Sequence, residues 1–281
     1  METKPFCLYR EQLPSNVIEL MLEKCIHHIP VVDNHGFLVD LLILDDLLEQ
    51  PSFPNPIIIM AGGRGERLKP LTNTCPKPML KINNTPILEI IIKKCIKSGF
   101  KNFYISVNYL KDNIINYFGN GEKWDVEINY IEESHSLGTC GSLSLLPDHI
   151  NHDIILMNGD VVTELELDRL LHFHQEKNSI FSVCTRTHRV KIPFAVLDTS
   201  NDYLNTFTEK PMYEYQINAG VYVLKPELLK LIPNGVYHTT DLIDNLLKNN
   251  LKVSVFPIHE NWIDIGSPNE FNRAQLSEYK D

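Results

Sequence analysis

Two cationic residues, Arg67 and Lys77, stand beside a glycine-rich loop that is suited to phosphate. The apolar run from Ile57 to Met60 predicts a buried strand. Directly after it come Ala61, Gly62, Gly63 and Gly65. Glycines in this position let the backbone approach a ligand and direct its N–H groups into one concavity, which fits phosphate oxygens. Arg67 adds a forked cation and Lys77 a point charge, so the segment predicts a polyphosphate site.

Two better-known glycine motifs do not fit this loop. The P-loop requires four residues between its glycines and then Gly-Lys-Ser/Thr, and no segment matches it. The dinucleotide fingerprint requires a third glycine where this chain has Leu68, counted from Gly63 and Gly65. An ordinary glycine-rich turn after a core strand is the remaining alternative. The prolines that stiffen the segment around Lys77 are Pro70, Pro76 and Pro78.

Two aspartates far apart in the sequence are candidate magnesium ligands. Asp160 follows the apolar run at 154–157 across an Asn-Gly turn, and Asp264 follows a second apolar stretch. Carboxylates at the carboxyl ends of strands suit magnesium, whereas a helix cap is the alternative for Asp160. His172 and His174 lie two apart on a predicted helix, hence on different faces, and are predicted to be surface residues rather than metal ligands.

The composition favours a globular protein without broad positive patches. The chain has 281 residues, 43% of them hydrophobic and 22% charged, which suits one large α/β domain with a small appendage. Its formal net charge of −10 argues against a nucleic-acid partner. Six cysteines lie scattered without a C-x-x-C pair, the first residues are too polar for a signal peptide, and no apolar run approaches membrane-spanning length. A cytoplasmic protein with reduced thiols and no membrane insertion is therefore expected.

Two segments of different character make up the chain, residues 1–54 and residues 55–281. The first has a helical pattern at 15–28, strands at 29–33 and from Phe37, a short helix at 45–49 and a proline-rich linker at 51–56. In the second, strands are predicted at 57–60, 103–107, 126–131 and 154–157, and helices at 86–98, 111–118, 141–146 and 268–279. This alternation predicts an α/β fold with a doubly wound, mainly parallel, Rossmann-like (GT-A-like) sheet. Ligands bind such sheets beyond the carboxyl ends of the strands, where the glycine loop lies.

The segment IIIMAGGRGERLKPLTNTCPKPM, residues 57–79, resembles the signature GGxGxRLxPLTxxxPKPM of the sugar-phosphate nucleotidylyltransferases. Those enzymes join a sugar 1-phosphate to a nucleoside triphosphate and release pyrophosphate. One departure is Glu66, where many members have threonine. The resemblance runs from about residue 56 to the end of the chain. It implies an enzyme of the EC 2.7.7 type that uses Mg²⁺, with an NTP and a sugar 1-phosphate as partners and a dimeric or tetrameric homo-oligomer as its assembly.

Further motifs in the family's order imply the site residues. The resemblance pairs Asp160 with Asp264 on one magnesium ion, which spacing alone could not do, and makes Arg67, Lys77 and Asp160 catalytic. The implied nucleotide-binding residues are Ala61, Gly62, Gly63, Gly65, Asn108, Gly138 and Thr139, with Glu132 as a further candidate. The implied sugar-binding residues are Gly159, Glu209 and Lys210 of an EKP motif, and Asn218 and Gly220 of a NAG motif. Taken without the family, the EKP residues would be an exposed pair and the NAG residues a turn.

The implied reaction is an in-line attack of the sugar phosphate on the α-phosphorus. Lys77 and magnesium would stabilise charge there, and Arg67 would hold the leaving pyrophosphate. The segments PKPMLKI, ISVNYL and FPIHENWIDIG resemble the guanylyltransferases of legionaminic-acid pathways, which use GTP and glucosamine 1-phosphate. Mannose-, heptose- and glucose-1-phosphate transferases that use GTP, dTTP or UTP are alternatives.

Functions of another class are less well matched. A glycosyltransferase of related fold usually has an Asp-x-Asp motif, whereas Asp160 is followed by two valines. A non-catalytic sensor homologue typically lacks the lysine or the metal aspartates, which are all present. No hexapeptide-repeat extension follows the last predicted helix, so a bifunctional uridylyltransferase–acetyltransferase is not expected.

The N-terminal segment IPVVDNHGFLVDLLILDDLL, residues 29–48, resembles the second half of a cystathionine-β-synthase-type (CBS) motif. Such motifs normally work in pairs that bind adenosine nucleotides. Here Asp40 and Ile43 occupy the usual small or hydroxyl positions, and only Asp46 matches the ribose-contacting carboxylate. A packing or dimerisation remnant is therefore predicted in preference to an adenosine site. The tail of a longer regulatory region is a further alternative.

Overall fold

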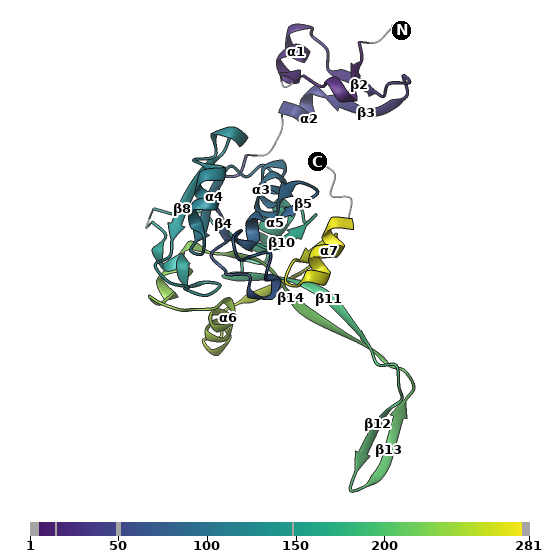
Figure 1. Ribbon diagram of the computed structural model, residues 1–281, viewed down its shortest axis with the longest axis vertical. Helices are drawn as coiled ribbons and strands as arrows, with labels where there is room; N and C mark the ends of the chain where they lie inside the picture. The colour runs from purple at the N-terminus through teal and green to yellow at the C-terminus, as the bar shows by residue number, and fades with distance from the viewer. Residues whose placement is uncertain (1–5, 15, 49–51, 148, 277–281) are drawn as a thin grey trace. The chain divides into compact units, whose positions relative to one another are not determined.

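The computed structural model describes residues 6–14, 16–48, 52–147 and 149–276. The chain divides into two compact units, Met1–Ser52 and Phe53–Asp281 (Figure 1). Phe53 pairs with Phe100, and the two rings stack at a centroid distance of 4.8 Å, while the Asn55 side chain donates to the carbonyl of Asp153 at 2.7 Å. The second half of the predicted linker is therefore packed into the large unit, and Pro51 lies outside the described residues.

The small unit is a three-stranded sheet in the order β1-β2-β3 with one core of three buried residues, Met21, Ile29 and Leu44. Its elements are β1 (Leu8–Tyr9), η1 (Arg10–Gln12), α1 (Val17–Glu23), β2 (His28–Val32), β3 (Leu38–Ile43) and α2 (Leu44–Leu48). The predicted helix to His28 is wrong at its C-terminal end, because Cys25 adopts a left-handed φ of 52°. The amide of Ile26 then donates back to Met21 at 2.9 Å and closes the helix.

A seven-stranded sheet in the order β15-β11-β14-β9-β4-β7-β8 forms the centre of the large unit. Its strands are β4 (Ile57–Met60), β7 (Asn102–Val107), β8 (Glu127–Glu132), β9 (Ile154–Asn158), β11 (Phe181–Lys191), β14 (Met212–Leu224) and β15 (Val253–Pro257). Only β14 runs antiparallel to its neighbours. The predicted α/β fold with a mainly parallel sheet is confirmed. No helix within the described residues is both long and apolar enough to cross a membrane.

Successive side chains of the central strands enter two separate cores, as alternation along a strand requires. Ile57 and Ile59 pack with α3 (Ile87–Lys97), α4 (Lys111–Phe118) and α5 (Leu167–Glu176), whereas Ile58 packs with α6 (Thr239–Lys248). The remaining helices are α7 (Pro268–Leu276) and the 3-10 helices η2 (Glu66–Leu68), η3 (Lys77–Met79), η4 (Glu122–Trp124), η5 (Gly141–Leu145) and η6 (Pro226–Leu231). Helices therefore cover both faces of the sheet (Figure 1).

Three sequence expectations are corrected or limited by these elements. The predicted helix at 141–146 is the 3-10 helix η5, because Leu146 is already extended ahead of Pro147. His174 is fully buried on α5, whereas its neighbour His172 is exposed, so the prediction of two surface histidines is wrong for His174. Its Nδ1 lies 2.7 Å from the hydroxyl of Ser182 on β11. The last residues of the predicted helix 268–279 lie outside the described residues.

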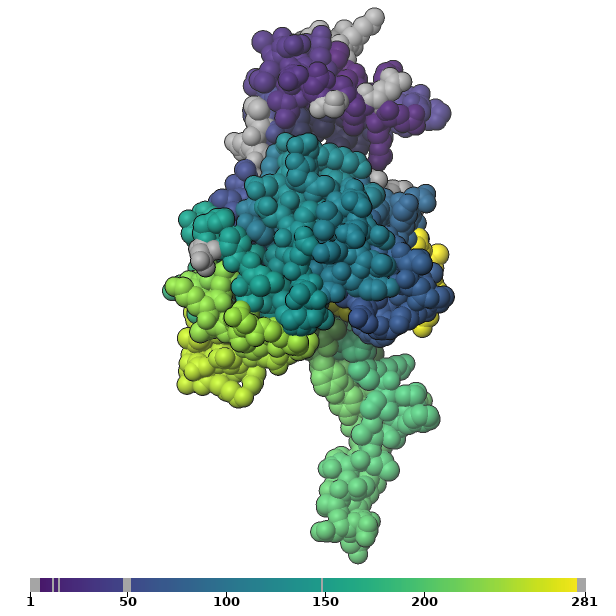
Figure 2. All heavy atoms as spheres, turned by 60° about the vertical axis from the view of Figure 1, so that its left-hand side comes forward, coloured from purple at the N-terminus to yellow at the C-terminus, as the bar shows by residue number. Residues whose placement is uncertain are grey.

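Two antiparallel strands continue beyond the sheet as a long ribbon. β11 and β14 remain paired from Thr185 opposite Asn218 to Lys191 opposite Met212. Between them, β12 (Val196–Ser200) and β13 (Tyr203–Thr208) form a hairpin that pairs only with itself. We call residues 186–217 the arm. It projects from the body of the large unit as a narrow extension (Figures 1 and 2).

Candidate functional site

The glycine loop leaves β4 at the carboxyl edge of the sheet, and two of its glycines are required by their surroundings. A Cβ on Gly62 would lie 3.1 Å from Oε1 of Glu133 and 3.2 Å from the Cβ of Asn108. Gly65 has a left-handed φ of 61°, and a Cβ there would lie 2.9 Å from Thr72. Gly63, by contrast, has no atom within 4 Å of its Cβ position and faces open space. The loop thus presents bare backbone to the space in front of it.

Lys77 is held where the sequence predicts a fixed cation. It opens η3 directly after Pro76, and its ammonium forms an ion pair with Asp160. The side chains are 11% and 26% exposed, so the pair is largely shielded from bulk water. Lys77 and Asp160 come from segments 83 positions apart, and the fold brings them into direct contact.

Asp264 lies next to Asp160 because two short strands pair. β10 (Val161–Thr163) runs antiparallel to β16 (Trp262–Asp264), with Val161 opposite Asp264, and the amide of Ile265 donates to the carbonyl of Asp160 at 3.0 Å. Burial raises the pKa of the Asp264 carboxyl above its usual range, and the nearby charge of Asp160 adds to this. Oδ1 of Asp264 is buried and has no hydrogen-bond partner.

Arg67 reaches the same cluster from η2. A Cβ on Gly266 would lie 3.2 Å from Nη2 of Arg67 and 3.3 Å from Oδ1 of Asp264. The guanidinium of Arg67 and the carboxylate of Asp264 therefore both lie beside the backbone of Gly266. Both Arg67 and Lys77 act against the rise in the pKa of Asp264. The structure thus brings together Arg67, Lys77 and the two aspartates, although the sequence separates the aspartates by more than a hundred positions.

The carboxylate pair is a suitable partial shell for magnesium. Mg²⁺ in nucleotide sites usually binds one or two protein carboxylates and completes its shell with water and substrate phosphates. The unpartnered, buried oxygen of Asp264 is the kind of atom such a cation would satisfy. Within the described residues, no group of three or more His, Cys, Asp or Glu side chains is placed to hold a metal. The two carboxylates are therefore the groups that could hold a metal ion here, and a substrate would have to supply further ligands.

The predicted nucleotide side of the site lies at the ends of β7 and β8. The amide of Asn108 donates to the backbone carbonyl of Glu133 at 3.0 Å, beside Gly62. Glu132, a candidate from the sequence, instead forms an exposed ion pair with Lys111 of α4. The buried carboxylate next to the glycine loop belongs to Glu133, which sequence reasoning missed. It accepts hydrogen bonds from the hydroxyl of Ser106 and, at 2.9 Å, from the amide of Leu137.

Gly138 and Thr139 are anchored by the segment that leads into α6. Gly138 has a φ of 81°, and a Cβ there would lie 2.6 Å from the carbonyl of Tyr237. The hydroxyl of Thr139 accepts a hydrogen bond from the amide of Thr239 at 3.0 Å and shares another with its hydroxyl at 2.9 Å. These contacts fix the loop after β8 but leave its role in nucleotide binding a prediction.

The NAG residues stand at a bulge where β14 enters the body. Asn218 pairs with Thr185, and the register then shifts before Tyr222 pairs with Val183. Gly220 has a φ of 73°, and a Cβ there would lie 2.6 Å from the side-chain amide of Asn158. The Asn218 side chain accepts from the amide of Gly220 at 3.0 Å.

Gly159 lies at the neighbouring strand end, between Asn158 and Asp160. Its amide donates to the carbonyl of Met60 at 2.9 Å, and a Cβ on it would lie 2.6 Å from that oxygen. The tip of β9 is thus packed directly on the start of the glycine loop. Gly159 and the NAG residues therefore border the Lys77–Asp160 pair.

Glu209 and Lys210 are not brought to this cluster. They lie on the arm, between β13 and β14, with side chains 61% and 62% exposed and their charged atoms 3.7 Å apart. Lys210 stands eight positions before Asn218 in the sequence. Along the extended backbone of the ribbon this separation is about 26 Å. Their role as sugar ligands therefore remains a prediction.

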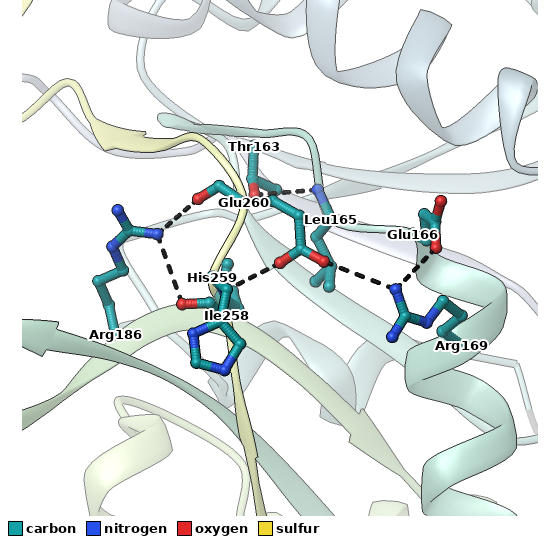
Figure 3. Close-up of polar contacts among 8 residues, drawn as sticks. All are labelled: Thr163, Leu165, Glu166, Arg169, Arg186, Ile258, His259 and Glu260. Carbon is teal, nitrogen blue, oxygen red and sulfur yellow. Dashed lines mark hydrogen bonds and ion pairs between the residues drawn. The ribbon is translucent and has the colours of Figure 1, made fainter.

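A polar clamp holds the base of the arm (Figure 3). Arg186 on β11 donates to the backbone carbonyls of Ile258 and Glu260, in the segment that leads into β16. The Glu260 carboxylate accepts from the amide of His259 at 2.9 Å and lies 3.9 Å from Arg169 of α5. No sequence pattern predicted this clamp, since it joins three segments that are far apart in the chain. It ties the start of the arm to the strand that carries Asp264.

These features define an α/β protein with a mainly parallel sheet. At the carboxyl edge of that sheet, two cations suited to phosphate, Arg67 and Lys77, meet two aspartates. Residues 57–280 match the Nucleotidyl transferase family, and residues 1–52 match the CBS domain. The chain therefore belongs to the nucleotidyl transferase family and has an N-terminal CBS domain.

Several relatives carry more specific names. The chain is 29% identical to the UTP--glucose-1-phosphate uridylyltransferase of Synechocystis sp., over 77% of this chain and 61% of the relative. It is 30% identical to the putative mannose-1-phosphate guanyltransferase of Sulfolobus acidocaldarius, over 78% of this chain and 62% of the relative. The crystal structure of HddC from Yersinia pseudotuberculosis is similar with a TM-score of 0.63 and 25% identity, over 79% of this chain and 98% of that chain. The chain spans about three fifths of the length of the two curated relatives.

Proposed function

We propose that this protein transfers a nucleoside monophosphate from an NTP to a sugar 1-phosphate, releasing pyrophosphate. The observation that carries the proposal is the convergence of Lys77, Arg67, Asp160 and Asp264 at the glycine loop. Cations from two segments and carboxylates from two others are what a phosphoanhydride exchange requires, because negative charge must be both held and shifted. A non-catalytic homologue would have no use for this complete set.

Each side chain has a distinct role in the proposed reaction. The loop amides and Arg67 bind the outgoing pyrophosphate, and Lys77 stabilises the charge that builds up at the α-phosphate. No general base is needed, because the attacking sugar phosphate is already a dianion near neutral pH. Mg²⁺, held by Asp160 and Asp264, would supply Lewis-acid polarisation of the phosphate oxygens. In its absence Lys77 neutralises Asp160, so the ammonium also keeps the two carboxylates from repelling each other.

We propose GTP as the nucleotide. The buried carboxylate of Glu133 lies beside Gly62 of the glycine loop, where it could contact the nucleobase of a bound NTP. An ionised carboxylate only accepts hydrogen bonds, so it favours a base edge with two donors, such as N1–H and N2–H of guanine. Each Glu133 oxygen already accepts one bond and retains a free lone pair. Four relatives are named as mannose-1-phosphate guanyl- or guanylyltransferases, one of them as putative, and HddC was crystallised with GMP-PN.

The sugar is less constrained than the base. We propose glucosamine 1-phosphate or a related hexose phosphate, for cell-surface glycan synthesis such as that of legionaminic acid. Glucose 1-phosphate and mannose 1-phosphate are alternatives, because two relatives are named for these substrates.

Pyrophosphate release across a panel of nucleoside triphosphates and sugar 1-phosphates tests the proposal directly. Lys77→Ala should lower kcat at least about 100-fold, as removal of one transition-state donor does. Lys97→Ala, an exposed lysine of α3, is the matched control and should leave the rate unchanged. Release of pyrophosphate by Lys77→Ala at the wild-type rate would overturn the proposal. Glu133→Gln should reduce the preference for GTP over UTP, and an unchanged preference would remove Glu133 from base recognition.

A further inference from the structure

Tyr109 lies two residues beyond β7 and holds the irregular segment that leads from η2 to Lys77. Its hydroxyl lies 3.1 Å from the carbonyl oxygen of Thr72 and 3.0 Å from that of Asn73. Its backbone amide donates to the carbonyl of Gly62 in the glycine loop at 3.5 Å. Tyr109 therefore contacts both the glycine loop and the segment that ends at Lys77.

Thr72 connects this support to the glycine loop. Its side chain is fully buried, and its hydroxyl donates to the carbonyl of Gly65 at 2.9 Å. A Cβ on Gly65 would lie 2.9 Å from Cγ2 of Thr72 and 3.0 Å from the Cβ of Lys77. Thr72 and Lys77 therefore both lie against the backbone of Gly65. Because close-packed groups transmit strain, a displacement of Thr72 would move both the loop and the lysine.

The backbone turns sharply directly after Tyr109. Leu110 is left-handed, with φ 49° and ψ 38°, a conformation that residues with a side chain rarely adopt. The helix α4 begins at the next residue, and the side-chain amide of Asn113 in its first turn donates to the carbonyl of Thr74 at 3.3 Å. The turn thus lets Tyr109 and Asn113 hold the same segment. Strained residues of this kind persist where the surrounding contacts fix them, often at functional sites.

The residue before Tyr109 belongs to the predicted nucleotide side of the site. The side-chain amide of Asn108 donates to the carbonyl of Glu133, the residue proposed to recognise the base, at 3.0 Å. Two adjacent residues therefore contact the base side and the phosphate side of the site. Tyr109 is the one that contacts the phosphate side.

We propose that Tyr109 is a positioning residue for nucleotidyl transfer: its hydroxyl holds Thr72 and thereby keeps the glycine loop and Lys77 in the geometry that the transition state requires. This inference rests on the proposed function. Lys77 acts on charge that develops at the α-phosphate during the reaction, so its displacement affects kcat more than KM. Loss of the Tyr109 hydroxyl should therefore slow the chemical step and leave binding of the sugar 1-phosphate largely unchanged.

Steady-state kinetics of four variants test this role. Tyr109→Phe removes the hydroxyl and keeps the ring. It should lower kcat about 10-fold or more, as misplacement of a reacting group does, and leave KM for the sugar 1-phosphate within about twofold. Tyr130→Phe is the matched control, because its hydroxyl also donates to a backbone carbonyl, that of Gly119 at 2.7 Å, and it should keep the wild-type kcat. Thr72→Val should reproduce the fall in kcat, whereas Thr72→Ser keeps the hydroxyl and should retain most of the activity.

A double-mutant cycle separates positioning from a general loss of stability. If Tyr109 acts through Lys77, Tyr109→Phe should reduce the residual kcat of Lys77→Ala much less than it reduces that of the wild type. A general loss of stability would reduce both by the same factor, and urea unfolding measures it independently.

Three results would overturn the inference. They are an unchanged kcat in Tyr109→Phe, a rise in KM without a fall in kcat, and equal effects of this substitution with and without Lys77. Pyrophosphate release by the wild type would in each case leave the proposed function standing. A wild type that releases no pyrophosphate would instead overturn the proposed function, and the inference with it.

Discussion

Replacing Asp264 by asparagine should stabilise the protein and abolish its activity at the same time. The folded state raises the pKa of Asp264, by burial first and by the charge of Asp160 second. Below the ordinary aspartate pKa of about 3.9, both the folded and the unfolded state are protonated and the group has no effect. As the pH rises, the unfolded chain releases its proton first, so the cost to stability grows until the pH has passed the raised pKa of the folded state.

The size of this effect follows from the unpartnered oxygen. Asparagine keeps a polar oxygen at this position and removes only the charge. The charge on a buried oxygen without a hydrogen-bond partner costs about 1–3 kcal/mol, and here Lys77 and Arg67 offset part of that cost. Asp264→Asn should therefore raise the free energy of unfolding by about 1 kcal/mol at pH 7. For a domain of this size, that is a rise in Tm of about 2–4 °C. The difference should shrink as the pH is lowered, because the raised pKa lets folded wild-type Asp264 take up its proton before the pH reaches the ordinary aspartate range.

Thermal unfolding with and without Mg²⁺ measures the effect of Asp264→Asn on stability, and the pyrophosphate assay measures its effect on activity. At ten times its Kd, Mg²⁺ should stabilise the wild type by about 1.4 kcal/mol, and this gain should be lost in Asp264→Asn. The kcat should fall by about 100-fold or more. Asp112→Asn, an exposed aspartate of α4, should change stability by less than about 0.5 kcal/mol. A variant that is less stable than the wild type at pH 7, or that keeps the Mg²⁺ effect, would refute the reasoning.

Three further perturbations test other parts of the structure. Gly220→Ala should lower the free energy of unfolding, measured in urea, by about 1–3 kcal/mol, because φ is 73° and the new Cβ would lie 2.6 Å from Asn158. Gly63→Ala is the control and should leave the stability unchanged, because no atom lies within 4 Å of its Cβ position. Burial lowers the pKa of His174, so the unfolded state takes up the proton first as the pH falls below about 6.5. Stability should then decline by up to about 1.4 kcal/mol per pH unit, and His174→Gln should flatten that dependence. Arg186→Met removes the donors to two carbonyls at the base of the arm and should lower the free energy of unfolding by about 1–3 kcal/mol. It should also lower kcat, because β16 would be displaced. An unchanged kcat would show that the clamp does not position the site.

Local patterns predict much of the large unit because its elements depend on local chemistry. The strand at 57–60 and the helix at 111–118 follow from the spacing of their apolar residues. The turn after the strand follows from glycines at positions where a side chain would meet close neighbours. The burial of His174 was also within reach, since Leu167, Leu170, Leu171 and His174 follow the i, i+3, i+4, i+7 spacing of one helix face.

What the sequence could not supply is pairing between distant segments. Nothing local says that Val161 lies opposite Asp264, and only the family resemblance joins the two aspartates. The choice between Glu132 and Glu133 depends on where β8 ends, and a shift of one residue reverses which side chain faces the glycine loop. The arm escaped prediction because its alternating strands look like those of a sheet, and their isolation is visible only in three dimensions.

One consequence follows from the course of β14, which forms half of the arm and then crosses the centre of the sheet beside β9. Insertions or deletions should be tolerated in evolution at the turn between β12 and β13, where they change only the reach of the hairpin. A single added residue between Met212 and Asn218 would instead invert the facing of every side chain on one side of it. Homologues are therefore expected to vary the length of the arm at its far end and to keep its inner segment constant in length.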